Sequence, residues 1–308
     1  MRYKNYLNQT IADLSGQIIV VTGANSGLGF EATRYLSYKG ATIVMACRNI
    51  AKAEVAKQTI INENPEAKLD IIAYDQADFA SIDAFIGQLK SKYRRIHALV
   101  CNAGIYYPQR NLEMKPGLKL TMGTNFIGLY YLLRQIMPYL DVVGAPTRVI
   151  FVSSLSAYHQ RNKAFKAMLK PNQSLFRQYA NSKLAIFHFF HVLANGMNLH
   201  DFQDRKNVSF FLMHPGVTAT HITDNFPNWL SRLAHGFLQF TVHHVDKASL
   251  GIVTLAGAQH VFNGSYIVPR GIFEISGFPR KRSFPKRMVR GSGQFIYDVG
   301  KYVRDISK

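Results

Sequence analysis

Tyr179 and Lys183 lie four residues apart at the start of a long apolar segment, and their types and spacing suit proton transfer. A free tyrosine has a pKa of roughly 10, and a nearby cation favours its ionised form. On a helix, this spacing places both side chains on one face. The same Tyr-x-x-x-Lys pattern also starts at Tyr35 and at Tyr297, so the spacing alone does not select the reactive pair.

Short β-branched runs alternate with longer amphipathic stretches and must position this pair. Runs this continuous predict strands that are buried on both faces of a parallel sheet. Their alternation with helices indicates βαβ units with right-handed crossovers. The expected strands are 18–22, 42–46, 69–73, 98–101, 148–152, 208–213 and, more weakly marked, 265–268. The expected helices are 28–38, 51–62, 81–93, 122–140, 179–197 and 247–257.

The domain organisation follows from this alternation, which no break in composition interrupts. A chain of 308 residues fits one large α/β domain. We expect a single doubly wound domain at 14–270, an N-terminal extension at 1–13 and a basic C-terminal tail at 271–308.

A glycine-rich turn directly follows the first expected strand, in T-G-A-N-S-G-L-G at 22–29. Glycines allow a tight turn, and backbone N–H groups at the start of the next helix suit a pyrophosphate. The spacing is G-x-x-x-G-x-G, and the strand–turn–helix context indicates nucleotide binding. The candidate residues of this turn are Gly23, Asn25, Ser26, Gly27, Leu28 and Gly29.

Arg48 ends the second expected strand, where NAD-binding enzymes usually place an acidic residue for the adenosine ribose. The planar, always charged guanidinium suits a 2′-phosphate. The sequence therefore predicts NADP as the cofactor in preference to NAD.

At this point the chain resembles the short-chain dehydrogenase/reductase superfamily, over about residues 14–270. The family's successive motifs appear in this chain in order and at suitable intervals. They are the turn at 22–29, Asp75, Asn102-Ala103-Gly104, Asn125, Ser154, Tyr179 with Lys183, and Pro215-Gly216. Within the superfamily, the chain resembles the retinol-dehydrogenase-like and protochlorophyllide-reductase-like branch. The features that carry this resemblance are D-L-S-G-Q at 13–17, A-C-R-N at 46–49 and the long gap from Ser154 to Tyr179. The resemblance implies a Rossmann-type domain with a mostly seven-stranded parallel sheet and helices on both faces.

The resemblance also implies catalytic roles. Tyr179 would exchange a proton with the substrate oxygen as hydride moves to or from the nicotinamide. Lys183 would lower the pKa of Tyr179 and hydrogen-bond the nicotinamide ribose. Ser154, preferred over Ser153, would orient the substrate oxygen. Asn125 would hold a water that links Lys183 to solvent.

The remaining motifs imply contacts with the cofactor. Asp75 would contact the adenine, and Asn102, Ala103 and Gly104 would support the central strand and line the cofactor. The nicotinamide end would be bordered by Pro215, Gly216 and Thr220. Two departures from the family pattern, Gln76 and Cys101, do not touch the proton relay.

Apolar residues gather where the family builds its substrate lid, at about 217–244, and either line a lipophilic pocket or pack on the core. We expect the insertion at 155–178 to overhang the active site. Both features favour a hydrophobic alcohol or carbonyl substrate. The apolar lid residues are Phe226, Trp229, Leu230, Leu233, Phe237, Leu238 and Phe240.

The chain is strongly basic, with 37 Lys and Arg against 18 Asp and Glu and a net charge of +19. Such a surface attracts anions. The tail suits either solvation or peripheral contact with an anionic membrane, whereas no nucleic-acid-binding motif accompanies the charge. A homo-oligomer is compatible with the sequence.

The remaining sequence features indicate an ordinary intracellular protein. No signal-peptide h-region or stretch of ~18 apolar residues is present, so we expect a cytoplasmic location, with or without membrane contact. Cys47 and Cys101 suit buried free thiols. The histidines lack metal-ligand spacing, so no metal is expected.

Three functions follow, and the first is favoured: an NADP-dependent oxidoreductase for hydrophobic alcohols or carbonyls. The alternative on the same fold is a non-catalytic NADP-binding sensor or interaction protein. The complete set of Asn125, Ser154, Tyr179 and Lys183 argues against a sensor. The third, a basic membrane- or nucleic-acid-binding protein, rests on charge alone.

Overall fold

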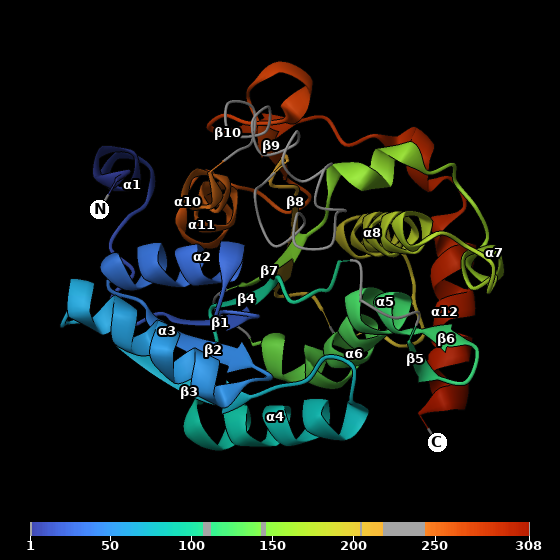
Figure 1. The fold of residues 1–308 in the computed structure, drawn as a ribbon, viewed down its shortest axis with the longest axis horizontal. Coiled ribbons are helices and arrows are strands. Elements are labelled where there is room, and N and C mark those ends of the chain that lie inside the picture. The colour runs from blue at the N-terminus through green and yellow to red at the C-terminus, as the bar shows by residue number, and fades with distance from the viewer. Residues whose placement is uncertain (1, 107–111, 143–145, 204, 218–243, 308) are drawn as a thin grey trace, which may run out of the picture.

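A mostly parallel sheet of eight strands forms the centre of the protein (Figure 1), in the order β10-β9-β8-β7-β4-β1-β2-β3. The structure is a computed structural model that describes residues 2–106, 112–142, 146–203, 205–217 and 244–307. The strands are β1 (Ile18–Thr22), β2 (Thr42–Cys47), β3 (Lys68–Ala73), β4 (Ala98–Cys101), β7 (Thr147–Val152), β8 (Val208–Met213), β9 (Tyr266–Pro269) and β10 (Pro279–Arg282). A separate pair comprises β5 (Glu113–Lys115) and β6 (Leu118–Lys119).

Helices cover both faces of the sheet, which confirms the predicted doubly wound α/β architecture. Alternate residues of β1 face opposite sides: Ile19 and Val21 join the cluster with α2 and α11, whereas Val20 joins the cluster with α4, α6 and α8. The main helices are α1 (Lys4–Thr10), α2 (Gly27–Tyr38), α3 (Ile50–Glu63), α4 (Phe79–Lys92), α6 (Gly128–Leu140), α8 (Leu175–Ala194), α10 (Val245–Ala248), α11 (Leu250–Gly257) and α12 (Ser292–Ile306). No helix in the described ranges is long and apolar enough to cross a bilayer.

The sequence predicts a basic tail at 271–308, but the structure has an eighth strand and a terminal helix in this segment. β10 pairs antiparallel with β9, and its charged residues remain exposed because it is the edge of the sheet. The amphipathic helix α12 buries Phe295, Ile296, Val299 and Val303. Phe295 packs on Phe165 and on the ring of His188 in α8. Residues 279–306 therefore belong to the folded domain, and their basic residues decorate its surface.

The long helix expected at 122–140 is interrupted at its start. Residues Leu120–Met122 form α5, Gly123–Ile127 form a π-helical segment, and α6 follows. Segments of this kind are frequent at functional sites. At its end, a Cβ on Gly128 would lie only 1.8 Å from the carbonyl oxygen of Gln76. Gly128 therefore permits close contact between the helix and the loop after β3.

We expect Gly128→Ala to lower the free energy of unfolding by about 2 kcal/mol, because the added methyl group overpacks a backbone contact. Gly87 in α4 is the matched control, since a Cβ there meets nothing within 4 Å. Gly87→Ala should instead raise stability by about 0.5–1 kcal/mol. Urea denaturation measures both values, and equal effects of the two substitutions would contradict the packing argument.

The insertion at 155–178 differs from the expected overhang. It contains the 3₁₀ helix Leu155–His159 and α7 (Phe165–Met168), and Phe165 packs against Phe295 and Tyr302 of α12. Phe165 thus helps to dock the C-terminal helix, a contact that the sequence did not reveal. The expected lid lies almost wholly outside the described residues.

Candidate active site

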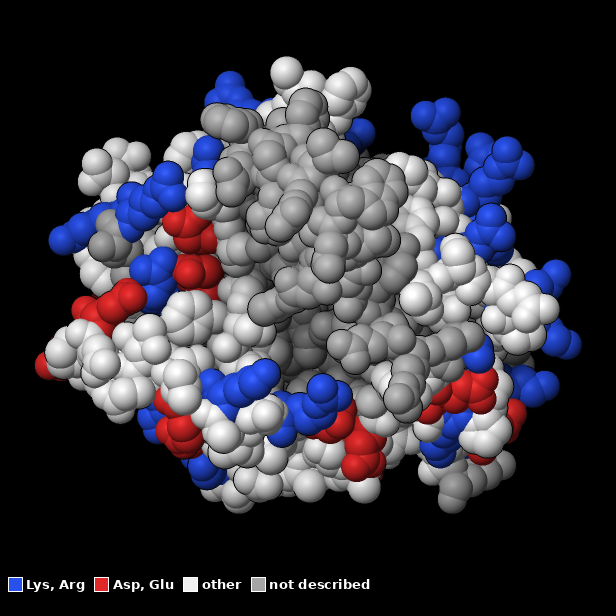
Figure 2. Space-filling model, in the orientation of Figure 1, with Lys and Arg blue, Asp and Glu red and all other residues white. Residues whose placement is uncertain are grey.

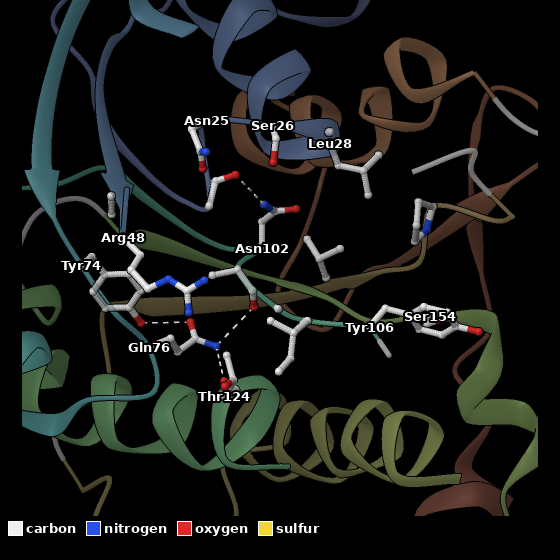
Figure 3. Close-up of a pocket in the computed structure, with 18 of the residues that line it drawn as sticks. Asn25, Ser26, Leu28, Arg48, Tyr74, Gln76, Asn102, Tyr106, Thr124 and Ser154 are labelled. Carbon is white, nitrogen blue, oxygen red and sulfur yellow. Dashed lines mark hydrogen bonds between the residues drawn. The ribbon is translucent and has the colours of Figure 1, made fainter. Parts of the chain in front are cut away.

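A cavity of about 520 Å³ opens at the carboxyl ends of the central strands. β1 lies between β2 and β4, so the chain turns to opposite sides of β1 at this point, where doubly wound sheets bind ligands. Its lining comes from the glycine turn after β1, the loops after β2, β3 and β4, and the ends of β7 and β8 (Figure 3).

The glycine turn brings backbone very close to the start of α2. Gly23 and Gly27 adopt φ values of 67° and 56°, which favour glycine. A Cβ on Gly29 would lie 2.3 Å from the carbonyl oxygen of Gly23. The three glycines thus form a turn that aims the amino end of α2 at the cavity, where its dipole and N–H groups favour an anion.

Thr22 and Asn102 tie this turn to the end of β4. The Thr22 hydroxyl donates to Val100 O at 3.1 Å and accepts from the backbone N–H groups of Asn102 and Ala103 at 3.0 and 2.9 Å. The Asn102 side-chain amide donates to Thr22 O at 2.8 Å. These contacts fix the separation of the two strand ends that border the cavity.

The adenosine side of the cavity, as the motifs predict it, carries several charged and polar side chains. Arg48 is largely exposed, and its guanidinium lies 4.0 Å from the Asp75 carboxylate, a weak surface pair. Lys52 also lines the cavity, one turn into α3, beyond the N-cap Asn49. Lys52 was missed by the motif reading, although its position four residues after Arg48 could have indicated it.

Gln76, a departure from the family pattern, is buried in a complete hydrogen-bond network. It accepts from the Tyr74 hydroxyl at 2.9 Å and donates to Ala103 O at 3.2 Å and Thr124 O at 2.5 Å. Figure 3 shows these bonds converging from three chain segments. Gln76 therefore connects the loops after β3 and β4 to the π-helical segment that carries Asn125.

Asn125 is buried and holds the loop after β4. Its side-chain oxygen accepts from Ile105 N at 2.7 Å, and its amide donates to Ile105 O at 3.0 Å and to the Ser182 hydroxyl at 3.0 Å. A Cβ on Gly104 would approach the Asn125 oxygen to 3.1 Å and Lys183 Nζ to 3.5 Å. Gly104 thus leaves room for these two polar groups beside the loop after β4.

Lys183 and Tyr179 lie on the first turns of α8 and reach the cavity together. Lys183 Nζ donates to Val152 O at 3.1 Å and lies 5.7 Å from the Tyr179 ring centroid. Burial lowers the pKa of Lys183 to about 8. Burial raises the pKa of Tyr179 to about 12, against a lowering by its hydrogen bond with Ser154. The lowered Tyr179 pKa that the resemblance implies is absent here, because the surrounding protein disfavours the phenolate more than its neighbours stabilise it.

The two serines after β7 have different environments. Ser153 is buried, and its hydroxyl donates to Lys183 O at 2.9 Å. Ser154 is half-buried, caps the following 3₁₀ helix through a bond from Ser156 N at 3.2 Å, and interacts with Tyr179. Both serines line the cavity, and Ser154 remains the predicted serine for orienting a substrate oxygen.

Tyr106 is a cavity residue that no motif indicated. Its ring packs edge-to-face on Tyr179, with centroids 4.4 Å apart and an interplanar angle of 89°. Such a pair is worth about 0.5–1.5 kcal/mol beyond burial. Tyr106 thus restrains the Tyr179 ring and adds an aromatic side chain to the cavity wall beside it.

The last wall of the cavity is Pro215-Gly216, which a buried histidine supports. His214 Nδ1 accepts from Gly216 N at 3.2 Å, so Nε2 carries the hydrogen toward the Glu274 carboxylate at 3.0 Å. Burial lowers the pKa of His214 and keeps the ring neutral. Glu274 lies in the C-terminal segment, so this segment helps to fix the turn.

Most of the predicted site residues converge on this cavity. Gly29 and Asn125 lie behind its lining and support it, and Thr220 lies outside the described residues. Sequence reasoning missed Ile105, Tyr106 and Thr124 because no spacing rule marks residues that a fold brings to a site. The predicted residues in the lining are Gly23, Asn25, Ser26, Gly27, Leu28, Arg48, Asp75, Asn102, Ala103, Gly104, Ser154, Tyr179, Lys183, Pro215 and Gly216.

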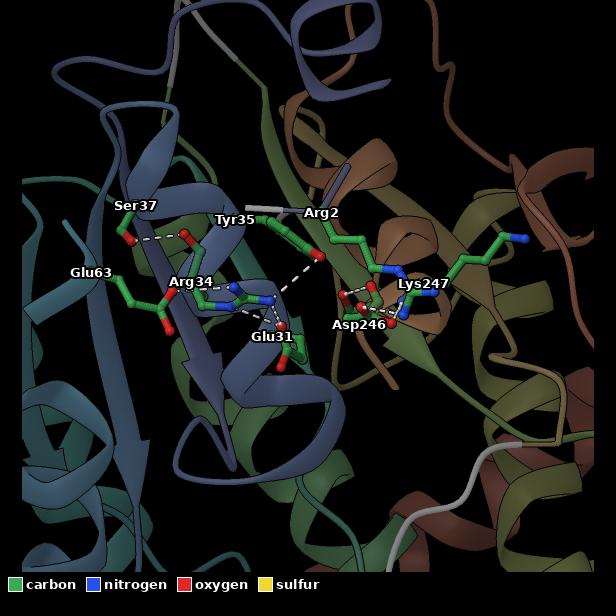
Figure 4. A network of polar contacts seen from close by, with 9 residues as sticks. Arg2, Glu31, Arg34, Tyr35, Ser37, Glu63, Asp246 and Lys247 are labelled. Atoms are coloured by element: carbon green, nitrogen blue, oxygen red, sulfur yellow. Dashed lines mark hydrogen bonds and ion pairs between the residues drawn. The ribbon is translucent and has the colours of Figure 1, made fainter. Parts of the chain in front are cut away.

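The other two Tyr-x-x-x-Lys patterns lie elsewhere. Tyr35 is buried in α2, where its ring contacts Arg34 in the polar network with Glu31 and Glu63 (Figure 4). Burial raises its pKa. Tyr297 is 58% exposed on α12. Neither tyrosine lines the cavity.

The fold and this cavity together define a nucleotide-binding α/β protein of the Rossmann type. The model of the short chain dehydrogenase family matches residues 17–231. The chain therefore belongs to the short-chain dehydrogenase/reductase family.

Similar curated proteins include human WW domain-containing oxidoreductase, 40% identical over 146 residues. That match covers 47% of this chain and 34% of the relative, so the chain spans about a third of the relative's length. Human dehydrogenase/reductase SDR family member 13 is 34% identical over 72% of this chain and 57% of its own. Human retinol dehydrogenase 11 is 25% identical over 89% and 84% of the two chains, which supports the retinol-dehydrogenase-like branch.

Solved structures share the fold at lower identity. An uncharacterized protein from Mycobacterium Paratuberculosis has a TM-score of 0.69 and 22% identity, with 96% of each chain covered. Levodione reductase has a TM-score of 0.63 and 16% identity, covering 79% of this chain and 92% of its own.

Proposed function

We propose that this protein is an NADP-dependent oxidoreductase that interconverts a hydrophobic alcohol and its carbonyl compound, with Tyr179 as the acid/base. The observation that carries the proposal is the convergence of Ser154, Tyr179 and Lys183 on the cavity that also contains the glycine turn. Asn125 braces the loop beside them. A binding protein without catalysis has no need of a buried lysine beside a phenol.

The residues of the cavity fit a nicotinamide dinucleotide. Gly29 leaves room for the turn to close on α2, so the N–H groups at the start of the helix face the cavity. Arg48 and Lys52 place positive charge at one end, and Tyr179 and Lys183 lie at the other. Bound there, the nicotinamide would supply or accept the hydride.

Tyr179 would give its proton to the carbonyl oxygen during reduction, or accept it from the alcohol during oxidation. Ser154 would hold the same oxygen through its hydroxyl. Lys183, close to the ring and charged below its pKa of about 8, would stabilise the phenolate that remains after proton donation. Tyr106 would press on the phenol ring and limit its motion.

NADP is proposed over NAD because Arg48 follows β2 with Lys52 close behind, and both line the cavity. We expect Arg48→Gln to raise the KM for NADPH about tenfold, since a charge-assisted bond contributes roughly 1.5–3 kcal/mol. The KM for NADH should change little. Arg94, an exposed arginine beyond α4, is the matched control. A wild-type enzyme that prefers NADH would overturn this assignment.

The substrate class is tested with a panel of aliphatic, aromatic and polyisoprenoid aldehydes, ketones and quinones. Oxidation of NADPH is followed by absorbance, and the same panel of alcohols is tested with NADP⁺. Turnover that increases with apolar chain length supports the proposal. Tight NADPH binding without turnover of any compound would favour the sensor instead.

A further inference from the structure

The loop that joins β9 to β10 presents two apolar side chains to solvent. Ile272 is 81% exposed and Phe273 is 85% exposed, the largest values among large apolar residues of the described chain. Figure 1 shows this loop projecting beyond β9 and β10 at the top of the view. Burial of such side chains stabilises a protein, so the exposure of two neighbours on a folded loop calls for a physical reason.

The loop is well ordered by its own backbone. Arg270 N donates to Phe278 O at 2.9 Å, and Gly271 N donates to Ser276 O at 2.8 Å. At the base, the Phe278 ring stacks on Tyr6 of α1 with centroids 5.3 Å apart. The loop is therefore closed and anchored, and its tip is held in place.

The tip is also held in a disfavoured conformation. Phe273 and Glu274 have φ values of 50° and 60°, in the left-handed region that residues other than glycine rarely adopt. Glu274 is only 5% exposed, and its carboxylate accepts from His214 Nε2 at 3.0 Å and pairs with Arg282. These contacts turn Glu274 inward and leave Ile272 and Phe273 directed outward. The fold thus stabilises a conformation that exposes apolar side chains.

Cations surround this tip. Arg270 precedes the loop and is exposed, as are Arg280, Lys281 and Arg282 of β10. Arg280 and Arg282 approach the Glu274 carboxylate at the base of the tip, with Arg280 Nη2 at 3.7 Å. Lys281 Nζ lies at the other end of β9, 5.9 Å from the ring of Phe262. Figure 2 shows Lys and Arg side chains on either side of the uncharged atoms at the top of the molecule. The result is a small apolar tip within a basic surface.

We propose that this hairpin tip inserts Ile272 and Phe273 into the interfacial region of an anionic lipid bilayer, while Arg270 and Arg280 contact its headgroups. Two side chains are too few for a stable protein interface, which buries about 800 Å² on each partner. They suit shallow insertion at a bilayer surface, which combines buried apolar area with electrostatic attraction. The chain's net charge of +19 adds to that attraction. The proposal does not depend on the reaction that the protein catalyses.

The proposal is tested by cosedimentation of the full chain with phosphatidylcholine vesicles, prepared with and without about 30 mol% of the anionic lipid phosphatidylserine. Wild type should bind the anionic vesicles and release at high salt. Ile272→Ser/Phe273→Ser should lower the partition coefficient about tenfold or more. Arg270→Gln, at the exposed position that directly precedes the loop, should lower it about fivefold, as expected for one cation near the surface.

Matched controls lie at the opposite edge of the sheet. Val55 on α3 is 69% exposed and Lys68 begins the edge strand β3, so Val55→Ser and Lys68→Gln remove the same chemistry elsewhere. Both should leave binding unchanged, and circular dichroism confirms the fold of every variant. Equal binding of wild type and the Ile272/Phe273 variant, or no binding by wild type, overturns the proposal. If the wild type forms a dimer without lipid and the Ile272/Phe273 variant does not, the tip serves self-association. That result overturns the proposal as well.

Discussion

Replacing Tyr179 by phenylalanine is expected to lower kcat by about 10³-fold, because positioned proton transfer typically contributes 10²–10⁴-fold. The affinity for NADPH should stay within about twofold of wild type, because the ring and its edge-to-face contact with Tyr106 remain. Steady-state turnover and fluorescence titration with NADPH separate the two effects.

Tyr297→Phe provides the control, because it removes a hydroxyl from the same Tyr-x-x-x-Lys pattern on the exposed face of α12. Its kcat should equal that of wild type. A Tyr179→Phe enzyme that retains a tenth or more of wild-type kcat (roughly the effect of an ordinary hydrogen bond) would mean that another group supplies the proton.

Replacing Lys183 by methionine is expected to abolish turnover and yet to stabilise the protein near pH 7. Burial holds the Lys183 pKa at about 8, below its ordinary 10.5. Below pH 8 the ammonium is charged in both states, and the folded state carries the whole penalty of burying it. This penalty is about 3 kcal/mol, since one pKa unit corresponds to about 1.4 kcal/mol. Methionine removes it but loses the bond to Val152 O, worth about 1 kcal/mol, so we expect a net gain of about 2 kcal/mol.

The pH dependence gives this prediction its sign. Between the folded pKa of about 8 and the unfolded value of 10.5, the unfolded state binds more protons at Lys183. The contribution of Lys183 to stability therefore rises with pH across this window. The gain from Lys183→Met, measured by urea denaturation without cofactor, should shrink between pH 7 and pH 10. The control is Lys301→Met, at the exposed lysine four residues after Tyr297, which should show no such trend. A Lys183→Met variant that is less stable than wild type at pH 7 would contradict the argument.

The central strands could be predicted well because each is a continuous apolar run that is buried on both faces of the sheet. β1, β4 and β8 occupy the expected residues, β2, β3 and β7 each extend one residue further at one end, and β9 is shifted by one residue. β10 escaped prediction because Pro-Arg-Lys-Arg has the composition of a solvated segment. It forms a strand at the exposed edge, where only one side of the backbone needs a partner.

The supporting residues of the site were less accessible to sequence reasoning. Gln76 looked like an incidental departure, yet it joins three segments that are far apart in the chain. Glu274 lay in an expected tail and instead fixes His214 beside the cavity. Such partners are chosen by the folded backbone, and a single sequence contains no periodic signal for them.

The order and spacing of its motifs alone determined that this chain is a doubly wound domain of the short-chain dehydrogenase/reductase family, and they predict Tyr179 and Lys183 as its reactive pair. Those features are local: an apolar run, a glycine turn and one helical face. Only the tertiary structure decided the protonation preferences of the pair, the hydrogen bond from Ser153 to Lys183 O, and the folding of the C-terminal residues onto the sheet. Each of these depends on burial and on partners remote in the sequence, because desolvation and hydrogen bonding are properties of the assembled site.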